Sequence, residues 1–296
     1  MAVIRSVRRD GKTYYYVVQS YRWKRIARQK SRYLGTRRPS NPGALRTAIE
    51  REVWAETWFV EFDRIRRAYQ ARRLGIPTSV DEEERYDFVV DFTYDTNRIE
   101  GSTLNRPETR ALLEQGITPP RKLWSDAVES RRHAALAEQV LRKPRTPTLA
   151  TLTAWHQRLF GETKADISGK LRDYEVRIGG SRHRPPPGAM VRLLLEELEA
   201  WLNSAARTLH PVERAGEFHL RFESIHPFGD GNGRVGRLAL NSMLAMNGFP
   251  PVNILFTKRQ AYYKALERSN VTESSRPFLH WFFAYYLRHR ANAGEV

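Results

Sequence analysis

The sequence predicts a mainly α-helical protein preceded by a small basic β-rich module. Residues 13–21 (TYYYVVQSY) are β-branched and aromatic, and residues 26–35 alternate loosely between apolar and polar, as paired strands do. From residue 44 onward, apolar residues recur at spacings of three and four, the period of amphipathic helices. With 296 residues, the chain is long enough for two domains.

The positive charge is concentrated in the N-terminal module. Residues 1–40 contain twelve lysines and arginines against the single acid Asp10, a net charge of +11 out of +17 for the chain. Arginines interleaved with tyrosines and Trp23 are typical of nucleic-acid surfaces, where charges contact phosphates and rings stack on bases. Residues 1–40 are therefore a candidate surface for nucleic acid. The alternative is a solubilising hairpin that packs on the rest of the protein or on a second subunit.

A turn-rich break at residues 36–43 precedes a long helix expected from about 44 to 74. Its apolar stripe comprises Trp54, Trp58, Phe62, Ile65 and Tyr69. We expect this stripe to pack against the C-terminal domain, and a homodimer contact is the alternative. Later helices are expected at 106–115, 124–141, 148–160, 189–205, 211–223, 232–247, 257–270 and 276–290.

The composition excludes some classes of site. Cysteine is absent, so the chain has no disulfide framework and no thiolate zinc site. No apolar run approaches the length of a membrane span, and the N-terminus lacks a signal-peptide core. We therefore expect a cytoplasmic protein without a membrane partner.

The stretch most informative about function is residues 225–237, IHPFGDGNGRVGR. It lies at the start of a predicted helix, where unpaired N–H groups and the helix dipole favour anions. Gly231 and Gly233 allow the backbone to curl around a phosphate. Arg234 and Arg237 are one helical turn apart, so both can face the same polyanion.

Two further side chains in this stretch indicate chemistry as well as binding. Asp230 is an oxygen ligand of the kind that Mg²⁺ uses beside phosphates, and His226 titrates near neutral pH. Each residue alone is common in surface turns or on solvated helix faces. Their combination predicts a site for nucleotide phosphates, a metal ion and the removal of a proton from an attacking hydroxyl.

The same stretch resembles the signature of the Fic (Fido-domain) family, His-x-Phe-x-(Asp/Glu)-Gly-Asn-Gly-Arg-x-x-Arg, with every defined position filled. The resemblance covers roughly residues 85–285, and it is strongest to the subclass that carries an inhibitory helix ahead of the Fic core. It implies a Fic-type helical bundle with a β-hairpin flap near residues 172–182. It also implies transfer of AMP from ATP to a Ser, Thr or Tyr hydroxyl of a target protein.

The resemblance implies a role for each matching residue. His226 would deprotonate the target hydroxyl, and Asp230 would hold a Mg²⁺ ion that bridges the α- and β-phosphates. The implied nucleotide-binding residues are Gly231, Asn232, Gly233, Arg234 and Arg237, with Tyr263 and Asn270 near the adenine. The implied flap residues, which would pair with the target backbone as an added strand, are Arg177, Ile178, Gly179, Gly180 and Ser181.

Thr96 and Glu100 match the inhibitory motif of the family in the stretch TNRIEG. They are four residues apart and share one face of a helix expected at about 84–101, with Gly101 as its C-terminal cap. The resemblance implies that Glu100 pairs with Arg237 and denies this arginine to the γ-phosphate. Taken alone, a glutamate here is more typical of a solvated helix end.

Two other functions stay open from the sequence. One is different chemistry at the same site: removal of AMP, for which Glu100 would position a water, or transfer of another phosphate-linked group. The other is a nucleic-acid-associated regulator whose Fic core senses nucleotides. The expected domains are 1–43 (basic β-rich module), 44–80 (linking helix) and 81–292 (Fic domain).

Overall fold

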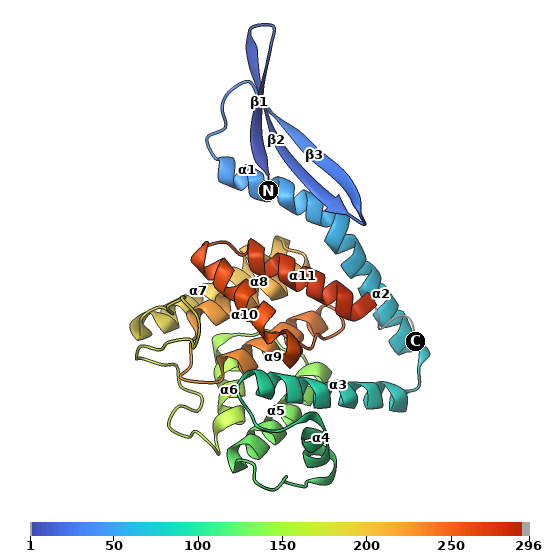
Figure 1. The fold of residues 1–296 in the computed structure, drawn as a ribbon, viewed down its shortest axis with the longest axis vertical. Coiled ribbons are helices and arrows are strands. Elements are labelled where there is room, and N and C mark those ends of the chain that lie inside the picture. Colours follow the sequence, from blue (N-terminus) through green and yellow to red (C-terminus); the bar gives the residue numbers. More distant parts are fainter. Residues whose placement is uncertain (1, 292–296) are drawn as a thin grey trace. The chain divides into compact units, whose positions relative to one another are not determined.

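The computed structural model describes residues 2–291, and the chain divides into two compact units after Arg64. The first unit contains a three-stranded antiparallel sheet of β1 (Val3–Arg9), β2 (Lys12–Trp23) and β3 (Ile26–Gly35) (Figure 1). Strands β2 and β3 confirm the predicted strands. Strand β1 was not predicted, because arginines interrupt its apolar alternation.

Helix α1 (Pro42–Trp54) packs on one face of this sheet. Val17 of β2 and Ile49 of α1 are fully buried in a small apolar cluster with Ala2. The cluster explains why the sheet has one covered face, since residues alternate between faces along each strand.

The predicted helix 44–74 is present as α1, a π-helical turn η1 (Ala55–Phe59) and α2 (Val60–Gly75). Within the first unit, Trp58 of the predicted apolar stripe packs edge-on against Trp23 of β2, with ring centroids 4.9 Å apart. This part of the stripe therefore contributes to the core of the N-terminal module.

The second unit is helical and confirms the prediction of a mainly α fold (Figure 1). Its longer helices after α2 are α3 (Thr78–Ile99), α4 (Arg106–Gln115), α5 (Trp124–Arg142), α6 (Leu149–Phe160), α7 (Val191–Asn203), α8 (Pro211–Ile225), α9 (Asn232–Met246), α10 (Arg259–Val271) and α11 (Arg276–Ala291). Short 3₁₀ turns are η2 (Gly188–Met190), η3 (Ala205–Thr208) and η4 (Phe256–Lys258). None of the helices within residues 2–291 combines the length and apolar composition of a membrane span.

Helices α8 and α9 form the centre of this unit. Every residue of α9 from Asn232 to Leu244 is buried, and Phe218 and Phe222 on α8 are fully buried. A helix that is buried on all sides holds its first turn in a fixed position. The functional stretch predicted from the sequence begins at the end of α8 and enters this helix.

The predicted β-hairpin flap is not present as paired strands, because residues 172–182 contain no strand. A single turn is closed by the Ser181 N–H, which donates to the Ile178 carbonyl at 3.2 Å. The returning arm contains the prolines 185–187, which have no N–H to donate to a ladder. At the base of the flap the two arms touch closely instead, since a Cβ on Gly188 would lie 2.2 Å from the Asp173 carbonyl carbon.

Candidate active site

The loop between α8 and α9 places His226 beside the start of α9. His226 ends α8 in the left-handed conformation (φ 52°), and its N–H donates to the Phe222 carbonyl at 3.0 Å. Asn232 closes the loop: its side-chain oxygen accepts from the Phe228 N–H, and its amide donates to the Phe228 carbonyl, both at 2.8 Å. The Asn232 side chain is therefore committed to the structure of this loop.

His226 has the protonation state that a base requires. Burial lowers its pKa from the ordinary value, so the imidazole is neutral near pH 7. Nδ1 lies 3.4 Å from the Glu223 carbonyl, which favours the tautomer with the proton on Nδ1 and the lone pair on Nε2. Arg172 fixes the backbone here, because its Nε donates to the His226 carbonyl at 2.7 Å.

Gly231 and Gly233 are required by space at the start of α9. Gly231 has φ 75°, and a Cβ there would lie 2.2 Å from Cε2 of Phe160. A Cβ on Gly233 would lie 2.2 Å from Oε1 of Glu100 and 2.7 Å from Nη1 of Arg237. The Glu100 carboxylate therefore contacts the first turn of α9, where free N–H groups favour an anion.

Glu100 and Thr96 both bind Arg237, and the Glu100 contact is the one that the family resemblance implied. The Arg237 side chain is 2 % exposed, and its Nη2 donates to Glu100 Oε1 at 2.7 Å. Its Nε donates to the Thr96 hydroxyl at 2.7 Å. Burial acts to lower the pKa of Arg237, but the Glu100 carboxylate, together with Tyr262 and Glu223, outweighs burial and raises it, so the guanidinium stays charged.

Helix α3 is anchored to the core near this pair. Gly101 follows its end with φ 99°, as predicted for a C-terminal cap. The buried Asp95 carboxylate accepts from the Asn253 side chain at 2.6 Å and from the Phe256 N–H at 2.7 Å. Asn97 donates to the Thr93 carbonyl at 2.9 Å. The inhibitory turn is thus held in place by residues other than Glu100.

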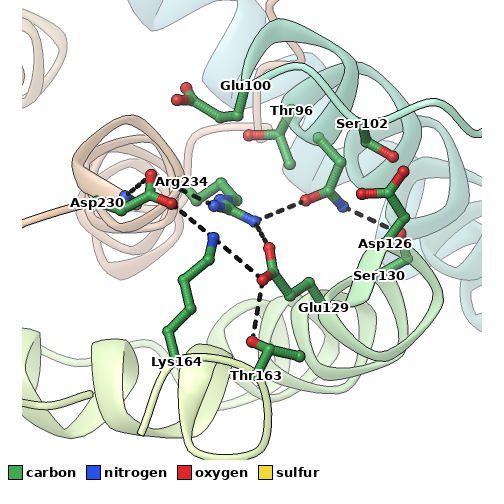
Figure 2. A network of polar contacts seen from close by, with 12 residues as sticks. Thr96, Glu100, Ser102, Asp126, Glu129, Ser130, Thr163, Lys164, Asp230 and Arg234 are labelled. Carbon is green, nitrogen blue, oxygen red and sulfur yellow. Dashed lines mark hydrogen bonds and ion pairs between the residues drawn. The ribbon is translucent and has the colours of Figure 1, made fainter. Parts of the chain in front are cut away.

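Arg234 and Asp230 belong to a second polar network, shown in Figure 2. Buried Arg234 donates to the carboxylate of Glu129, and its Nη1 lies 3.4 Å from the Asn97 side-chain oxygen. Asp230 accepts from Lys164 Nζ at 2.6 Å and from the Gly231 N–H at 2.5 Å. This network links the start of α9 to α5 and to the segment after α6.

The Asp230 carboxylate is ionised and accessible. Burial acts to raise its pKa, but the charges of Arg234 and Lys164 outweigh this effect and hold the pKa below its ordinary value. The side chain is 42 % exposed. Mg²⁺ is commonly held by one or two carboxylates together with substrate phosphates, so Asp230 beside an anion site fits this ion.

The side chain of His156 contacts the loop that contains Asp230. The sequence alone did not indicate a role for this histidine. Its ring stacks on Phe228 with centroids 4.0 Å apart. The Gly169 N–H donates to Nδ1 at 2.9 Å, so Nε2 carries the proton and donates to the Asp230 carbonyl at 3.0 Å. Burial lowers the pKa of His156 to about 4, so it stays neutral.

The two residues implied near the adenine lie in different surroundings. The hydroxyl of Tyr263 on α10 donates to the Ile99 carbonyl at 3.2 Å, which places it at the inhibitory turn. The Asn270 side-chain oxygen accepts from the Ser224 hydroxyl at 2.5 Å, near the end of α8. Tyr263 therefore lies beside the end of α3, and Asn270 lies beside the end of α8.

The flap residues 177–181 leave most of their backbone without partners within the described chain. The segment after them is anchored, because the Arg182 N–H donates to Glu267 at 2.9 Å and His183 Nε2 lies 2.9 Å from the Ser224 carbonyl. On the other side, buried Arg172 donates to the Tyr174 and Pro186 carbonyls. The arrangement is an exposed arm held at both ends.

The fold is helical, and the site brings together an imidazole, a helix start whose free N–H groups favour anions, and the Glu100–Arg237 ion pair. Residues 146–244 match the family model described as Fic/DOC family. "Protein adenylyltransferase Fic" from Drosophila melanogaster is 34% identical over 195 residues, which are 63% of this chain and 38% of that protein. The protein of the same name from Drosophila virilis is 31% identical over 254 residues, 81% of this chain and 50% of that protein.

Solved structures of Fic proteins superpose on this chain. A structure of Fic-1 from C. elegans superposes with a TM-score of 0.70 at 26% identity, over 86% of this chain and 78% of that one. A Fic domain containing signaling protein from Bacteroides thetaiotaomicron shares the fold, with a TM-score of 0.69 at 21% identity over 79% of this chain and 97% of that one. The chain belongs to the Fic/DOC family, which confirms the resemblance. It spans half or less of the length of these two Drosophila relatives.

Proposed function

We propose that this protein transfers AMP from ATP to a hydroxyl side chain of a target protein, and that Glu100 inhibits the transfer. The relatives named protein adenylyltransferase support the reaction class. The observation that carries the inhibition is the 2.7 Å contact between Glu100 and Arg237, made against Gly233 in the first turn of α9. A carboxylate there occupies an anion position and neutralises the arginine that would bind the outer phosphate.

The proposed reaction gives a step to each of several residues of this chain. His226 Nε2 takes the proton of the target hydroxyl, whose oxygen forms a bond to the α-phosphorus while the bond to the β-phosphate oxygen breaks and pyrophosphate leaves. The N–H groups at Gly233 and Arg234 bind phosphate oxygens. Asp230 is the residue that would hold Mg²⁺, which supplies charge neutralisation for the departing phosphates. Positioning and electrostatics of this kind provide most of the catalysis in phosphoryl-type transfer.

The flap offers a backbone edge on which the target can dock. Residues 177–181 are held at both ends, as described above, and their unpaired backbone groups suit the addition of a strand from a partner. Such pairing supplies affinity through main-chain hydrogen bonds. We therefore propose that the target presents its hydroxyl on an extended segment, which lies along Arg177 to Ser181.

The inhibition is tested by removing the carboxylate. We expect Glu100→Gly and the isosteric Glu100→Gln to label protein with α-labelled ATP at least tenfold faster than wild type, because Arg237 is released. Glu114→Gln is the matched control, since Glu114 pairs with Arg110 at 2.7 Å on the surface; its labelling should equal that of wild type.

The double variant Glu100→Gly with His226→Ala should show no labelling. If Glu100→Gly labels no faster than wild type, the inhibitory role is wrong. If instead wild type removes AMP from a labelled protein and Glu100→Gly does not, the site performs the reverse chemistry with Glu100 as a water-positioning residue.

We further propose that the N-terminal sheet binds duplex nucleic acid through the face opposite α1. The register places Arg5, Arg9 and Arg22 on that face with Tyr16 and Tyr33, whose rings lie 5.4 Å apart. All three arginines are exposed and make no ion pair with a described residue. On the face that packs on α1, by contrast, two basic residues are neutralised: Lys30 pairs with Glu56, and Arg32 pairs with Glu52 at 3.0 Å.

Equal charge changes on the two faces test this proposal. The full chain with Arg5, Arg9 and Arg22 changed to alanine should lose salt-dependent retention of duplex DNA in a gel-shift assay. The chain with Arg28, Lys30 and Arg32 changed to alanine loses the same charge and should retain DNA. Equal loss in both variants would indicate nonspecific charge attraction, and absence of binding by wild type at low salt would refute the proposal.

A further inference from the structure

Lys164 holds the carboxylate that is proposed to bind the metal. Its side chain crosses the ring of Phe160, with Nζ 4.9 Å from the centroid, and reaches Asp230 Oδ2 at 2.6 Å. The same Nζ lies 3.2 Å from Oε1 of Glu129. One ammonium group therefore contacts two carboxylates, and Figure 2 shows it between them.

Glu129 is the fixed member of this network. It is 7% exposed and lies on α5. Its Oε1 accepts from the Thr163 hydroxyl at 2.9 Å, and its Oε2 accepts from buried Arg234. Because Glu129 has these other partners, Lys164 can leave Asp230 and still keep a carboxylate beside it.

Both oxygens of Asp230 are already in use. Oδ1 accepts from the Gly231 N–H at 2.5 Å, and Oδ2 accepts from Lys164. Two carboxylates and two cations balance one another in the network of Asp230, Glu129, Lys164 and Arg234. A divalent cation on Asp230 would add charge beside Lys164, and like charges at such a distance repel.

We propose that Lys164 is a tethered cation that occupies the metal-binding carboxylate Asp230 and is displaced from it when a metal–nucleotide binds. Lys164 is thus a positioning residue: it neutralises Asp230 when no metal is bound, and it opposes metal binding. The inference rests on the proposed function, because Asp230 must be the metal carboxylate. The quantity to measure is therefore how strongly nucleotide affinity depends on the metal.

Calorimetric titration with ADP measures this dependence in the full chain. ADP keeps the phosphates next to Asp230 and lacks the γ-phosphate that the Glu100–Arg237 pair is proposed to exclude. The quantity is the ratio of the ADP Kd in EDTA to that in saturating Mg²⁺. In Lys164→Met we expect this ratio to rise roughly three- to tenfold, the effect of one partly exposed ion pair.

Two control variants test whether the effect depends on a positive charge at position 164 and not on the loss of any nearby lysine. Lys164→Arg keeps a cation beside Asp230, and its ratio should stay near that of wild type. Lys170→Met removes a lysine of the same segment whose Nζ contacts only the Asp166 carbonyl at 2.9 Å, and its ratio should be unchanged.

The outcomes distinguish the two proposals. An unchanged ratio in Lys164→Met would refute the displacement, and an equal loss of ADP affinity with and without Mg²⁺ would show that Lys164 is a phosphate ligand instead. Either result leaves AMP transfer, measured by His226-dependent labelling, untouched. If wild type binds ADP equally with and without Mg²⁺ and Lys164→Met does the same, Asp230 is not a metal ligand and both assignments are wrong.

Discussion

Gly233 is the residue at which the proposed inhibitory contact and the proposed phosphate site meet. A methyl group on this glycine would collide with the Glu100 carboxylate, so the inhibitory contact requires the same bare backbone that a phosphate would require. The linear motif predicted this glycine, the histidine and Asp230, because these residues lie within one short stretch. It could not predict Lys164 or Glu129, because they reach the site from other segments.

Arg172 illustrates another limit of sequence reasoning. It is almost fully buried, and its guanidinium donates to backbone carbonyls around His226 and the flap base. In the sequence it is one of 50 lysines and arginines, and nothing local marks it as buried. Arg172 gains these carbonyl partners only in the folded protein, where the flap returns beside α8.

The pH dependence of transfer tests the state of His226. Because burial lowers its pKa below the ordinary 6.5, the imidazole remains a free base in mildly acid solution. We expect kcat/KM of Glu100→Gly to hold as pH falls to 6.5 and to decline only below that value. His226→Ala should lower the rate by roughly 10²–10⁴ at every pH. An acid limb centred above pH 6.5 would contradict the burial argument.

Among the elements, α3 contains the proposed inhibitory residues and α9 begins at the proposed binding site. The end of α3 and the start of α9 were predictable from Gly101 and the glycine-framed loop, but α3 begins at Thr78, earlier than the expected residue 84. The prediction that the flap forms a β-hairpin was wrong. Its returning arm contains prolines, and side chains anchor the flap in place of hydrogen bonds between strands. Periodicity does not report such side-chain anchoring.

Loosening α3 without touching Glu100 should partly relieve the inhibition. Asp95→Ala removes the acceptor for Asn253 and the Phe256 N–H, so the last turn of α3 loses its anchor. We expect AMP transfer to rise by roughly five- to thirtyfold, the effect of one or two lost hydrogen bonds, and to stay below that of Glu100→Gly. Labelling with α-labelled ATP, together with thermal denaturation to monitor folding, provides the measurement.

The control for this prediction lies one turn earlier on the same helix. Asp91 pairs with Arg106 at 2.7 Å in a solvated position, so Asp91→Ala should leave transfer unchanged. If the two variants behave alike, the anchor at Asp95 has no part in holding the inhibitory turn.

In the whole molecule, a basic module accompanies the proposed active site. Excess positive charge lies on a three-stranded module, and the proposed nucleotide site lies within a helical unit. Composition indicated the first, and the Fic motif predicts the second. Neither composition nor the motif predicted strand β1, whose pairing with β2 completes the basic sheet face through contacts between residues such as Arg5 and Tyr16.

We propose that the start of α9 binds a metal-bearing triphosphate and that Glu100 excludes its productive pose. A crystal structure of Glu100→Gly with Mg²⁺ and α,β-methylene ATP is the decisive measurement, because this analogue resists cleavage at the scissile bond. We expect phosphate oxygens at the Gly233 N–H, the metal on Asp230, and His226 Nε2 facing the α-phosphorus. Phosphates bound elsewhere, or an imidazole turned into the protein interior, would contradict it.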